Sequence, residues 1–508
     1  MREIDRRTID DLGISSLVLM ESAGLGLVDE IESRHKRERL RVTVVCGPGN
    51  NGGDGMVAAS HLADRGHEVV TFLAAPRATF SGDAKVQLRT LTRLDMDVTV
   101  LSSQSSYERA FRRAGDSDII IDSLFGTGLV RAVEGQWAEC VRIINSCPGL
   151  VISADVPSGL DARTGHPLGE CVTADVTVTF GLPKTGLVLF PGAQFAGEVV
   201  VADIGIPCSV IETMDLPGAL LGPEAVEGVY EERWPDTHKG SYGHLLLCCG
   251  STGKLGAGIL ASRGALRAGA GLVTLAVPAS AIHEVDAATP EVMTSPLPET
   301  AGGSFSRMGA NGLKKLIMER DALGIGPGLS TDPEVAELVR EVLSWESFPA
   351  VLDADALNVL EGDLELLRPR GQSTVITPHP GEMSRLIGGS TRDVQSDRIG
   401  AALECAGRSG CVVVLKGAGT VVGHPDGTFF INTTGNPGMA SGGTGDVLTG
   451  MIGALLARGC NTLDSAKAAV YLHGAAADLA AAKVSEHALT ATDIIDSIGL
   501  TLMGMRTE

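Results

Sequence analysis

Short apolar runs alternate with helical patterns along the whole chain, and this alternation limits the fold more than any other feature. RVTVVC, at Arg41–Cys46, is β-branched, apolar and followed at once by glycines, as in a strand buried on both faces of a parallel sheet. Strands that alternate with helices build a parallel sheet with helices on both sides, so we predict an α/β fold throughout. Further strands are predicted at 69–73, 118–122, 150–154, 176–180, 199–202, 244–249, 272–277, 322–325, 350–353, 374–377 and 412–416, and helices at 55–65, 255–268, 442–457, 463–482 and 491–503.

A proline-rich segment divides the alternation into two halves. Pro207, Pro217, Pro223 and Pro235 fall within it, and no helical or strand period is sustained between them. The chain has 508 residues. Single hydrophobic cores stop growing at about 250–300 residues, so we expect two domains. We place the boundary near residue 220, with an N-terminal domain at 1–215 and a C-terminal domain at 223–508.

The composition argues against several classes of protein. Asp and Glu number 62 against 41 Lys and Arg, a net charge of −21, whereas a general nucleic-acid binder carries a basic face. No run reaches the roughly 18 apolar residues of a membrane span, and the charged segment Met1–Asp11 is unlike a secretory signal. The ten cysteines form no CxxC pair and are interpreted as buried, reduced thiols. We therefore expect a cytoplasmic protein that binds neither nucleic acid nor membrane.

The first predicted strand ends in GPGNNGGDG, at Gly47–Gly55, in which five of nine residues are glycine. The spacing includes G-x-G-x-x-G, typical of a dinucleotide site in which bare backbone meets a pyrophosphate at a helix N-terminus. That site also needs an acidic residue about 20 positions later, and TFLAAPR has none, which disfavours ordinary NAD-dependent redox binding. Asn50, Asn51 and Asp54 add oxygens that suit a polar ligand or a cation. A purely structural turn is the other alternative.

Oxygen-bearing side chains end two more predicted strands. Asp122 follows one in IIIDSLFGTGLVR, and Asp155 and Ser158 follow another in ISADVPSGLDARTG. Ligands of open α/β sheets bind outside the carboxyl ends of the strands, so we expect these residues to converge on the glycine-rich turn. Each aspartate taken alone could instead form a turn or cap a helix.

These motifs, with LMESAG at Leu19–Gly24, resemble the NAD(P)H-hydrate epimerase domain over about residues 1–210. The resemblance implies a Rossmann-like three-layer αβα domain that interconverts the R and S forms of hydrated NADH or NADPH at C6 of the nicotinamide ring. It implies Asp155 as the acid/base residue, assisted by Lys184. It also implies a potassium ion on Asn51, Asp122 and Ser158, whose oxygens suit a hard cation. The implied substrate contacts are Asn50, Asn51, Gly52, Gly53, Asp54, Gly126, Thr127, Gly128, Leu129, Val130, Arg131, Ala132 and Asp155.

In the second half, GNPGMASGGTGDVLTGMIGALLA places glycines before an apolar helix with Asp446 in its first turn. Backbone N–H groups and the positive end of the helix can bind an anion there. Asp446 can take a proton from a hydroxyl as phosphoryl transfer begins, or it only complements the helix dipole. GSTGK at Gly250–Lys254 is not a P-loop, because the first glycine of that motif would fall on Cys248 and Leu255 replaces Ser or Thr.

This arrangement resembles the ribokinase-like fold. Six further motifs narrow the resemblance to the ADP- or ATP-dependent NAD(P)H-hydrate dehydratases over about residues 225–505. They are KGSYGHLLLCCGS, GALRAGAGLVTLAVP, GIGPGL, LDADALN, TPHPGEMSRL and VLKGAGTVV. The resemblance implies a ribokinase-like αβα domain that phosphorylates the C6 hydroxyl of the S hydrate; loss of phosphate then restores NAD(P)H. ADP is the expected donor, with ATP as the alternative, and magnesium would accompany it. The implied hydrate contacts are Ala257, Gly328, His379 and Asp446, and the implied nucleotide contacts are Lys416, Gly417, Ala418, Gly419, Thr420 and Gly445.

Together the halves predict a bifunctional repair enzyme, an isomerase joined to a lyase, that binds small molecules and forms a homo-oligomer. A kinase of a small alcohol or hydroxymethylpyrimidine is disfavoured by the HPGE turn and by the fusion, and a nucleotide-sensing scaffold by the presence of Asp155 and Asp446. Glycine makes up 65 of the 508 residues. We interpret the excess as backbone placed against phosphates, which would let an acidic chain bind anions.

Overall fold

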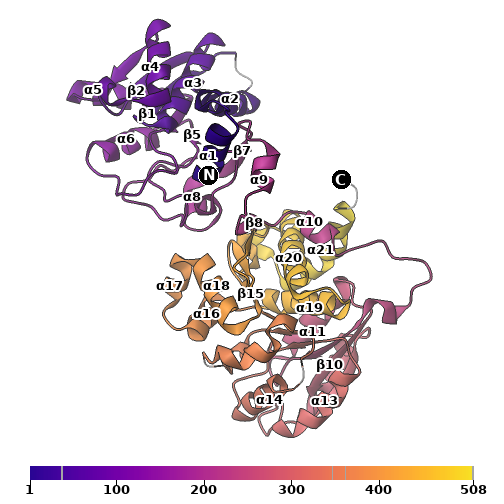
Figure 1. The fold of residues 1–508 in the computed structure, drawn as a ribbon. Coiled ribbons are helices and arrows are strands. Elements are labelled where there is room, and N and C mark those ends of the chain that lie inside the picture. Colours follow the sequence, from indigo (N-terminus) through magenta and orange to yellow (C-terminus); the bar gives the residue numbers. More distant parts are fainter. Residues whose placement is uncertain (36–37, 346, 361, 506–508) are drawn as a thin grey trace. The chain divides into compact units, whose positions relative to one another are not determined.

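The computed structural model describes residues 1–35, 38–345, 347–360 and 362–505. It divides into two compact units, Met1–Asp215 and Leu216–Glu508, each built on its own sheet (Figure 1). The second unit includes the residues just before position 223, because strand β8 (Gly218–Leu220) pairs with a strand of the second sheet.

The first unit contains a seven-stranded parallel sheet in the order β3-β2-β1-β4-β5-β6-β7. Strand β4 (Ile119–Ser123) is buried on both faces of the sheet. Its successive side chains point to opposite faces, so that Ile119 and Ile121 belong to one hydrophobic cluster and Ile120 belongs to another. The strands are β1 (Arg41–Cys46), β2 (Glu68–Leu73), β3 (Val98–Val100), β4 (Ile119–Ser123), β5 (Leu150–Ala154), β6 (Val176–Phe180) and β7 (Glu198–Ala202).

Helices cover both faces of this sheet. Helices α2, α3 and α4 pack against one another, and α5 packs against α6. The helices are α1 (Arg2–Arg6), α2 (Ser16–Arg34), α3 (Asn50–Asp64), α4 (Gly82–Arg93), α5 (Gln104–Gly115), α6 (Gln136–Asn145), α7 (Thr185–Val188), α8 (Gly192–Ala196) and α9 (Cys208–Glu212). The unit is the Rossmann-like three-layer domain that the sequence predicts.

The second unit contains a ten-stranded sheet in the order β11-β10-β9-β12-β13-β14-β15-β16-β17-β8. Its strands are parallel from β11 to β15; β16 pairs antiparallel with β15, β17 pairs antiparallel with β16, and β8 pairs parallel with β17. The strands are β8 (Gly218–Leu220), β9 (His244–Cys248), β10 (Leu272–Pro278), β11 (Met293–Leu297), β12 (Ala322–Ile325), β13 (Ala350–Leu352), β14 (Thr374–Ile376), β15 (Val412–Leu415), β16 (Thr420–Gly423) and β17 (Phe429–Asn432).

The long helices α11, α19, α20 and α21 pack together against this sheet, and α18 packs on β15 and β16 (Figure 1). No helix within the described ranges is long and apolar enough to cross a membrane. The helices are α10 (Glu224–Glu227), α11 (Leu255–Arg267), α12 (Ile282–Ala288), α13 (Ala310–Met318), α14 (Pro333–Leu343), α15 (Asp355–Asn358), α16 (Pro380–Ile387), α17 (Thr391–Ser396), α18 (Arg398–Ser409), α19 (Thr444–Ala457), α20 (Thr462–Val484) and α21 (Ala491–Gly504).

The predicted strands are all present, with ends that differ by a residue or two, and the α/β class is confirmed. Strands β3, β8, β11, β16 and β17 were not predicted. Helix α3 begins at Asn50 rather than at Gly55, so GPGNNGGDG is mostly the first turns of a helix and not a loop.

Most glycines of GPGNNGGDG allow helix and strands to pack closely. This corrects the interpretation of these glycines as backbone placed against phosphates. A Cβ on Gly52 would lie 1.9 Å from the carbonyl oxygen of Gly47, and one on Gly47 would lie 2.0 Å from the carbonyl oxygen of Leu124. A Cβ on Gly55 would lie 2.1 Å from Ser123 Oγ. Gly49, by contrast, faces open space. Helix α3 therefore approaches the ends of β1 and β4 as closely as backbone permits.

Candidate active sites

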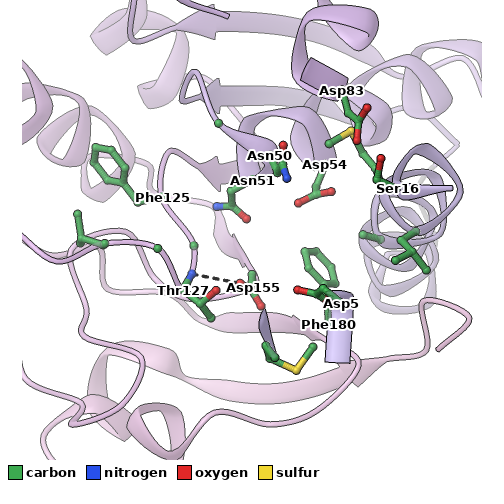
Figure 2. Close-up of a pocket in the computed structure, with 18 of the residues that line it drawn as sticks. Asp5, Ser16, Asn50, Asn51, Asp54, Asp83, Phe125, Thr127, Asp155 and Phe180 are labelled. Atoms are coloured by element: carbon green, nitrogen blue, oxygen red, sulfur yellow. Dashed lines mark hydrogen bonds between the residues drawn. The ribbon is translucent and has the colours of Figure 1, made fainter. Parts of the chain in front are cut away.

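A cavity of about 740 Å³ opens in the first unit where β1, β4 and β5 end (Figure 2). The strand order reverses between β1 and β4, which is where open α/β sheets bind ligands. The predicted contacts Gly52, Gly53 and Ala132 are not part of its wall, since the two glycines are buried within α3 and Ala132 is exposed elsewhere. The predicted residues that do line it are Asn50, Asn51, Asp54, Gly126, Thr127, Gly128, Leu129, Val130, Arg131, Asp155 and Lys184.

Asp155 is held in an unusual backbone conformation by bonds on both sides. Its φ is +65°, a left-handed value that costs energy for a residue with a side chain. Its N–H donates to Val178 O at 2.8 Å, and its Oδ2 accepts from the Thr127 N–H at 3.3 Å (Figure 2). Lys184 Nζ lies 2.6 Å from its Oδ1. The carboxylate is therefore fixed at the cavity wall.

Lys184 is buried, and its ammonium has a partner in each direction. Nζ donates to Thr179 Oγ1 at 2.9 Å and to Phe180 O at 2.8 Å, in addition to its ion pair with Asp155. Two hydrogen bonds and a carboxylate at ion-pair distance make burial of this charge tolerable. The lysine predicted as an assistant to Asp155 is thus in direct contact with it.

Two further carboxyls face the cavity, Asp54 on α3 and Asp5 on α1 (Figure 2). Burial raises the pKa of Asp54 well above its ordinary value, and the charges of Asp155 and Asp5 raise it further. Burial also raises the pKa of Asp5. The cavity therefore places Asp155 in the same wall as two carboxyls whose pKa values are raised. Asp5 was missed because no motif surrounds it and only the fold brings α1 over the cavity.

Of the three residues predicted to bind potassium, Asn51 lines the cavity, whereas Asp122 and Ser158 are buried and are not part of its wall. Asp122 is fully buried; its Oδ1 accepts from Ser158 Oγ at 2.6 Å, and its Oδ2 accepts from the Ser158 N–H at 2.8 Å and from Ser153 Oγ at 2.9 Å. Burial raises the pKa of Asp122, against these hydrogen bonds. Asn51 is different: neither polar atom of its buried amide has a hydrogen-bond partner among the described residues. An unpaired buried amide indicates a site for a polar ligand or a cation.

Gly126 brings the Asn51 amide and the Asp155 carboxylate to one place. A Cβ on Gly126 would lie 2.9 Å from Asp155 Oδ2 and 3.4 Å from Asn51 Oδ1. Any side chain at this position would meet both groups, so only glycine leaves the space open to a ligand.

In the second unit, side chains gather at the ends of β13 and β15 and the start of α19. Lys416 Nζ lies 2.6 Å from Oδ1 of the buried Asp353, and Thr449 Oγ1 donates to Asp353 Oδ2 at 2.8 Å. A Cβ on Gly445 would lie 3.5 Å from Lys416 Nζ, so two predicted nucleotide contacts are neighbours. Sequence reasoning missed Asp353 and Thr449, because their partners are far away along the chain.

Asp446 lies in the first turn of α19 beside this pair. Burial raises its pKa to about 6, the charge of Asp353 adds to the increase, and Lys416 opposes it. A carboxylate that titrates near neutrality is suited to accept a proton and release it again. The local charges therefore match the role of a base that the sequence predicts for Asp446.

His379 caps α16 and is half-exposed. Its Nδ1 accepts from the Gly381 N–H at 3.0 Å, and its own N–H donates to Glu382 Oε2 at 2.8 Å. Glu382 is buried, which raises its pKa, while the charge of Lys416 lowers it. His379 is therefore not a core histidine, and Glu382 of the same turn faces the cluster around Lys416.

Ala257 and Gly328, two predicted hydrate contacts, are adjacent. Gly328 has a φ of +68°, and a Cβ there would lie 3.1 Å from Ala257 Cβ. Ser251 Oγ donates to Gly328 O at 2.7 Å and fixes this turn. Among the described residues, no group of three or more His, Cys, Asp or Glu side chains is arranged to hold a metal ion without other ligands.

Comparison with known proteins places both halves in described families. Residues 245–499 match the family described as NAD(P)H-hydrate dehydratase, and residues 16–186 match the family described as YjeF-related protein N-terminus. The bifunctional NAD(P)H-hydrate repair enzyme Nnr of Moorella thermoacetica is 43% identical, with 100% of this chain and 96% of that protein covered. The enzyme of the same name from Thermofilum pendens is 38% identical, with 99% and 95% covered.

A solved structure supports the predicted fold of the C-terminal unit. A ribokinase-like superfamily protein from Enterococcus faecalis is similar with a TM-score of 0.51 and 26% identity, covering 57% of this chain and 98% of that chain. These comparisons agree with the resemblance of the motifs. The two family matches follow each other along the chain, and the relatives align over nearly their whole length. The chain belongs to the family of bifunctional NAD(P)H-hydrate repair enzymes.

Proposed function

We propose that the first unit epimerises hydrated NADH or NADPH at C6, and that the second unit converts the S hydrate back to NAD(P)H at the expense of ADP, with ATP as the alternative donor. The observation that carries the proposal is that each unit of this family member places a carboxyl beside charged neighbours, Asp155 next to Lys184 in one and Asp446 next to Asp353 and Lys416 in the other.

In the first unit, Asp155 would exchange a proton with the C6 hydroxyl of the substrate, so that water leaves C6 and adds again to the other face of the ring. Lys184 Nζ, 2.6 Å from Oδ1, holds the carboxyl at the cavity wall. Asn50, Asp54 and the segment Gly126–Arg131 would hold the substrate, since they form the adjoining wall.

A potassium ion would be held by Asn51, Asp122 and Ser158. The unpaired buried amide of Asn51 supports this site, and amide, hydroxyl and carboxylate oxygens suit a hard cation. When bound, the ion supplies positive charge beside an otherwise acidic cavity. Thermal unfolding in potassium and in sodium chloride tests the site: we expect potassium to stabilise the parent protein more than sodium does. Asn51→Ala should abolish that difference.

In the second unit, Asp446 would take the proton of the C6 hydroxyl as the hydroxyl oxygen attacks the terminal phosphorus of ADP or ATP and AMP or ADP leaves. Phosphate is a better leaving group than hydroxide, and its departure from C6, with loss of a proton from C5, restores the ring double bond. Lys416 to Thr420 and Gly445 would bind the nucleotide, while Ala257, Gly328 and His379 would contact the hydrate. Magnesium would enter with the phosphates, because Mg²⁺ is usually held by one or two carboxylates together with substrate phosphates.

The test is recovery of reduced nicotinamide absorbance from a mixture of R and S hydrates. The parent protein with ADP, or with ATP, should recover the whole mixture. No recovery with either nucleotide would contradict the dehydratase activity. A cytoplasmic location and a homo-oligomeric state stay predictions from the sequence.

A further inference from the structure

Arg398, at the start of α18, is a buried arginine next to the loop that joins β15 to β16. It forms no ion pair with any described residue. Its Nη1 donates to Gln395 Oε1 at 2.6 Å, and its Nη2 lies 3.0 Å from Leu415 O, 3.2 Å from Lys416 O and 3.3 Å from Gly419 O. Burial lowers its pKa to about 10, so the guanidinium stays charged at neutral pH.

A buried charge needs compensation, and here backbone carbonyls supply it. A planar guanidinium offers five donors in a fixed geometry, so one side chain can serve several carbonyls at once. The three carbonyls served by Arg398 all belong to the end of β15 and to the loop that follows. The arginine therefore determines which way the carbonyls of this loop point.

The same loop leaves its N–H groups available. Thr420 Oγ1 donates to Gly417 O at 2.8 Å, so most of the carbonyls from 415 to 419 have a donor. The N–H groups of Gly417, Ala418 and Gly419 have no acceptor in the part of the chain that the structure describes. Gly417 and Gly419 have φ values of +133° and +63°. Successive N–H groups in such a turn can face one side and bind an anion.

We infer that Arg398 is a positioning residue for the dehydratase: by holding the carbonyls of Leu415, Lys416 and Gly419, it keeps the N–H groups of residues 417–419 turned toward the phosphates of the nucleotide. The inference rests on the proposed nucleotide site. A Cβ on Gly417 would lie 3.3 Å from both Nη atoms, so the glycine lets the loop approach the guanidinium closely.

The test is Arg398→Lys in the full chain. Lysine keeps the charge, but its single nitrogen cannot satisfy the same set of acceptors, so the loop loses its fixed orientation. We expect the KM for ADP to rise by about tenfold, while kcat and the KM for the hydrate change by less than about twofold. The increase in melting temperature that ADP confers on the parent should shrink in the variant. An unchanged KM for ADP would overturn the inference.

Arg370→Lys is the matched control. Arg370 is also buried, and it donates to the carbonyls of Val342 and Phe348, which lie outside the nucleotide loop. This variant should leave the KM for ADP unchanged. An equal rise in both variants would mean general loosening of the domain and would overturn the specific role of Arg398.

A milder variant covers the case in which Arg398→Lys does not fold. Gln395 is exposed and contacts only Nη1, so Gln395→Ala loosens Arg398 without removing it. The KM for ADP should rise by about twofold to threefold, and no rise would overturn the inference. If the parent protein has no dehydratase activity with ADP or ATP, the proposed function fails first, and the inference fails with it.

Discussion

An aspartate is the proposed proton-transfer group at each site, and the surroundings of the two carboxyls differ. Asp155 is ion-paired to the buried Lys184, whose Nζ also donates to Thr179 Oγ1 and Phe180 O. Asp446 has a partly buried carboxyl beside Asp353 and Lys416. Burial and the charge of Asp353 raise its pKa to about 6, although Lys416 opposes the increase. Asp446 can therefore change its protonation state near neutral pH.

Replacing Asp446 with asparagine removes the base and keeps the size of the side chain. We expect the kcat of the dehydratase to fall by about 10²- to 10⁴-fold, as is usual for loss of a general base. Epimerase activity should be unchanged, because Asp155 belongs to the other unit. Asp496→Asn, at an exposed acid on α21, is the control and should keep both activities. Loss of less than tenfold in Asp446→Asn would contradict its role as the base.

The pKa of Asp446 also predicts a pH dependence. A base acts only when ionised, and a pKa of about 6 means that the ionised fraction is lost as the pH falls through 6. The kcat/KM of the dehydratase should therefore be level above that pH and fall by about tenfold per pH unit below it. Initial rates between pH 5 and 8 check this expectation. A kcat/KM that stays level down to pH 5 would show that the buried environment does not raise the pKa of Asp446.

Asp155→Asn should stop epimerisation and spare dehydration. Recovery of a mixed R and S hydrate would then stall at the S fraction, whereas the parent protein recovers all of it. Asp116→Asn, at an exposed acid of the same unit, should behave like the parent. Full recovery by Asp155→Asn at the rate of the parent would exclude Asp155 as the acid/base residue.

At the scale of single residues, motifs identified the groups that stand next to glycine turns, such as Asp155 and Asp446. They did not identify Asp5, Asp353 or Glu382. These residues act through neighbours far away in the chain: Asp353 meets Lys416 across 63 positions and Thr449 across 96. Such pairs depend on strand order, which no local spacing specifies.

At the scale of elements, Gly52 and Gly49 give a matched pair within one turn. Alanine at Gly52 would place its Cβ 1.9 Å from a backbone oxygen, and alanine at Gly49 would meet nothing within 4 Å. Gly52→Ala should therefore destabilise the first unit by about 1–3 kcal/mol, and Gly49→Ala by less than about 0.5 kcal/mol. The loss of stability is measured by heating each variant and assaying the epimerase activity that remains, with the dehydratase activity of the same sample as the internal reference. Equal loss in both variants would contradict the packing role of Gly52.

Strands were predictable where β-branched runs are continuous and buried on both faces, as in Arg41–Cys46. The hairpin β16–β17 was not, because the glycine-rich KGAG precedes TVVG and the turn-forming HPDGT follows it, so neither TVVG nor FFIN stands apart from its surroundings. The start of α3 was misplaced for a related reason. Glycine and asparagine have low helix propensity, yet close packing against β1 and β4 makes them helical here.

At the scale of the whole molecule, an acidic chain must bind anionic substrates. The net charge of −21 offers no attraction at long range, so binding depends on local groups. For the second unit we propose Lys416, the N–H groups of the loop after β15 and the start of α19. In the first unit most glycines of the glycine-rich segment allow close packing, and we propose that side chains of the cavity wall such as Asn51 and Lys184 bind the substrate.

Each unit has its own sheet and its own site, which predicts that the two activities can be supplied by different molecules. Full-length Asp155→Asn retains the dehydratase site, and full-length Asp446→Asn retains the epimerase site. Hydrated NADH is a small diffusible molecule, so a mixture of the two variants should recover R and S hydrates completely, although neither variant does so alone. The recovery is followed by the absorbance of reduced nicotinamide over time. The control is each variant alone at twice its concentration in the mixture. If the mixture stalls at the S fraction, the hydrate must instead pass between the two sites of one chain without release.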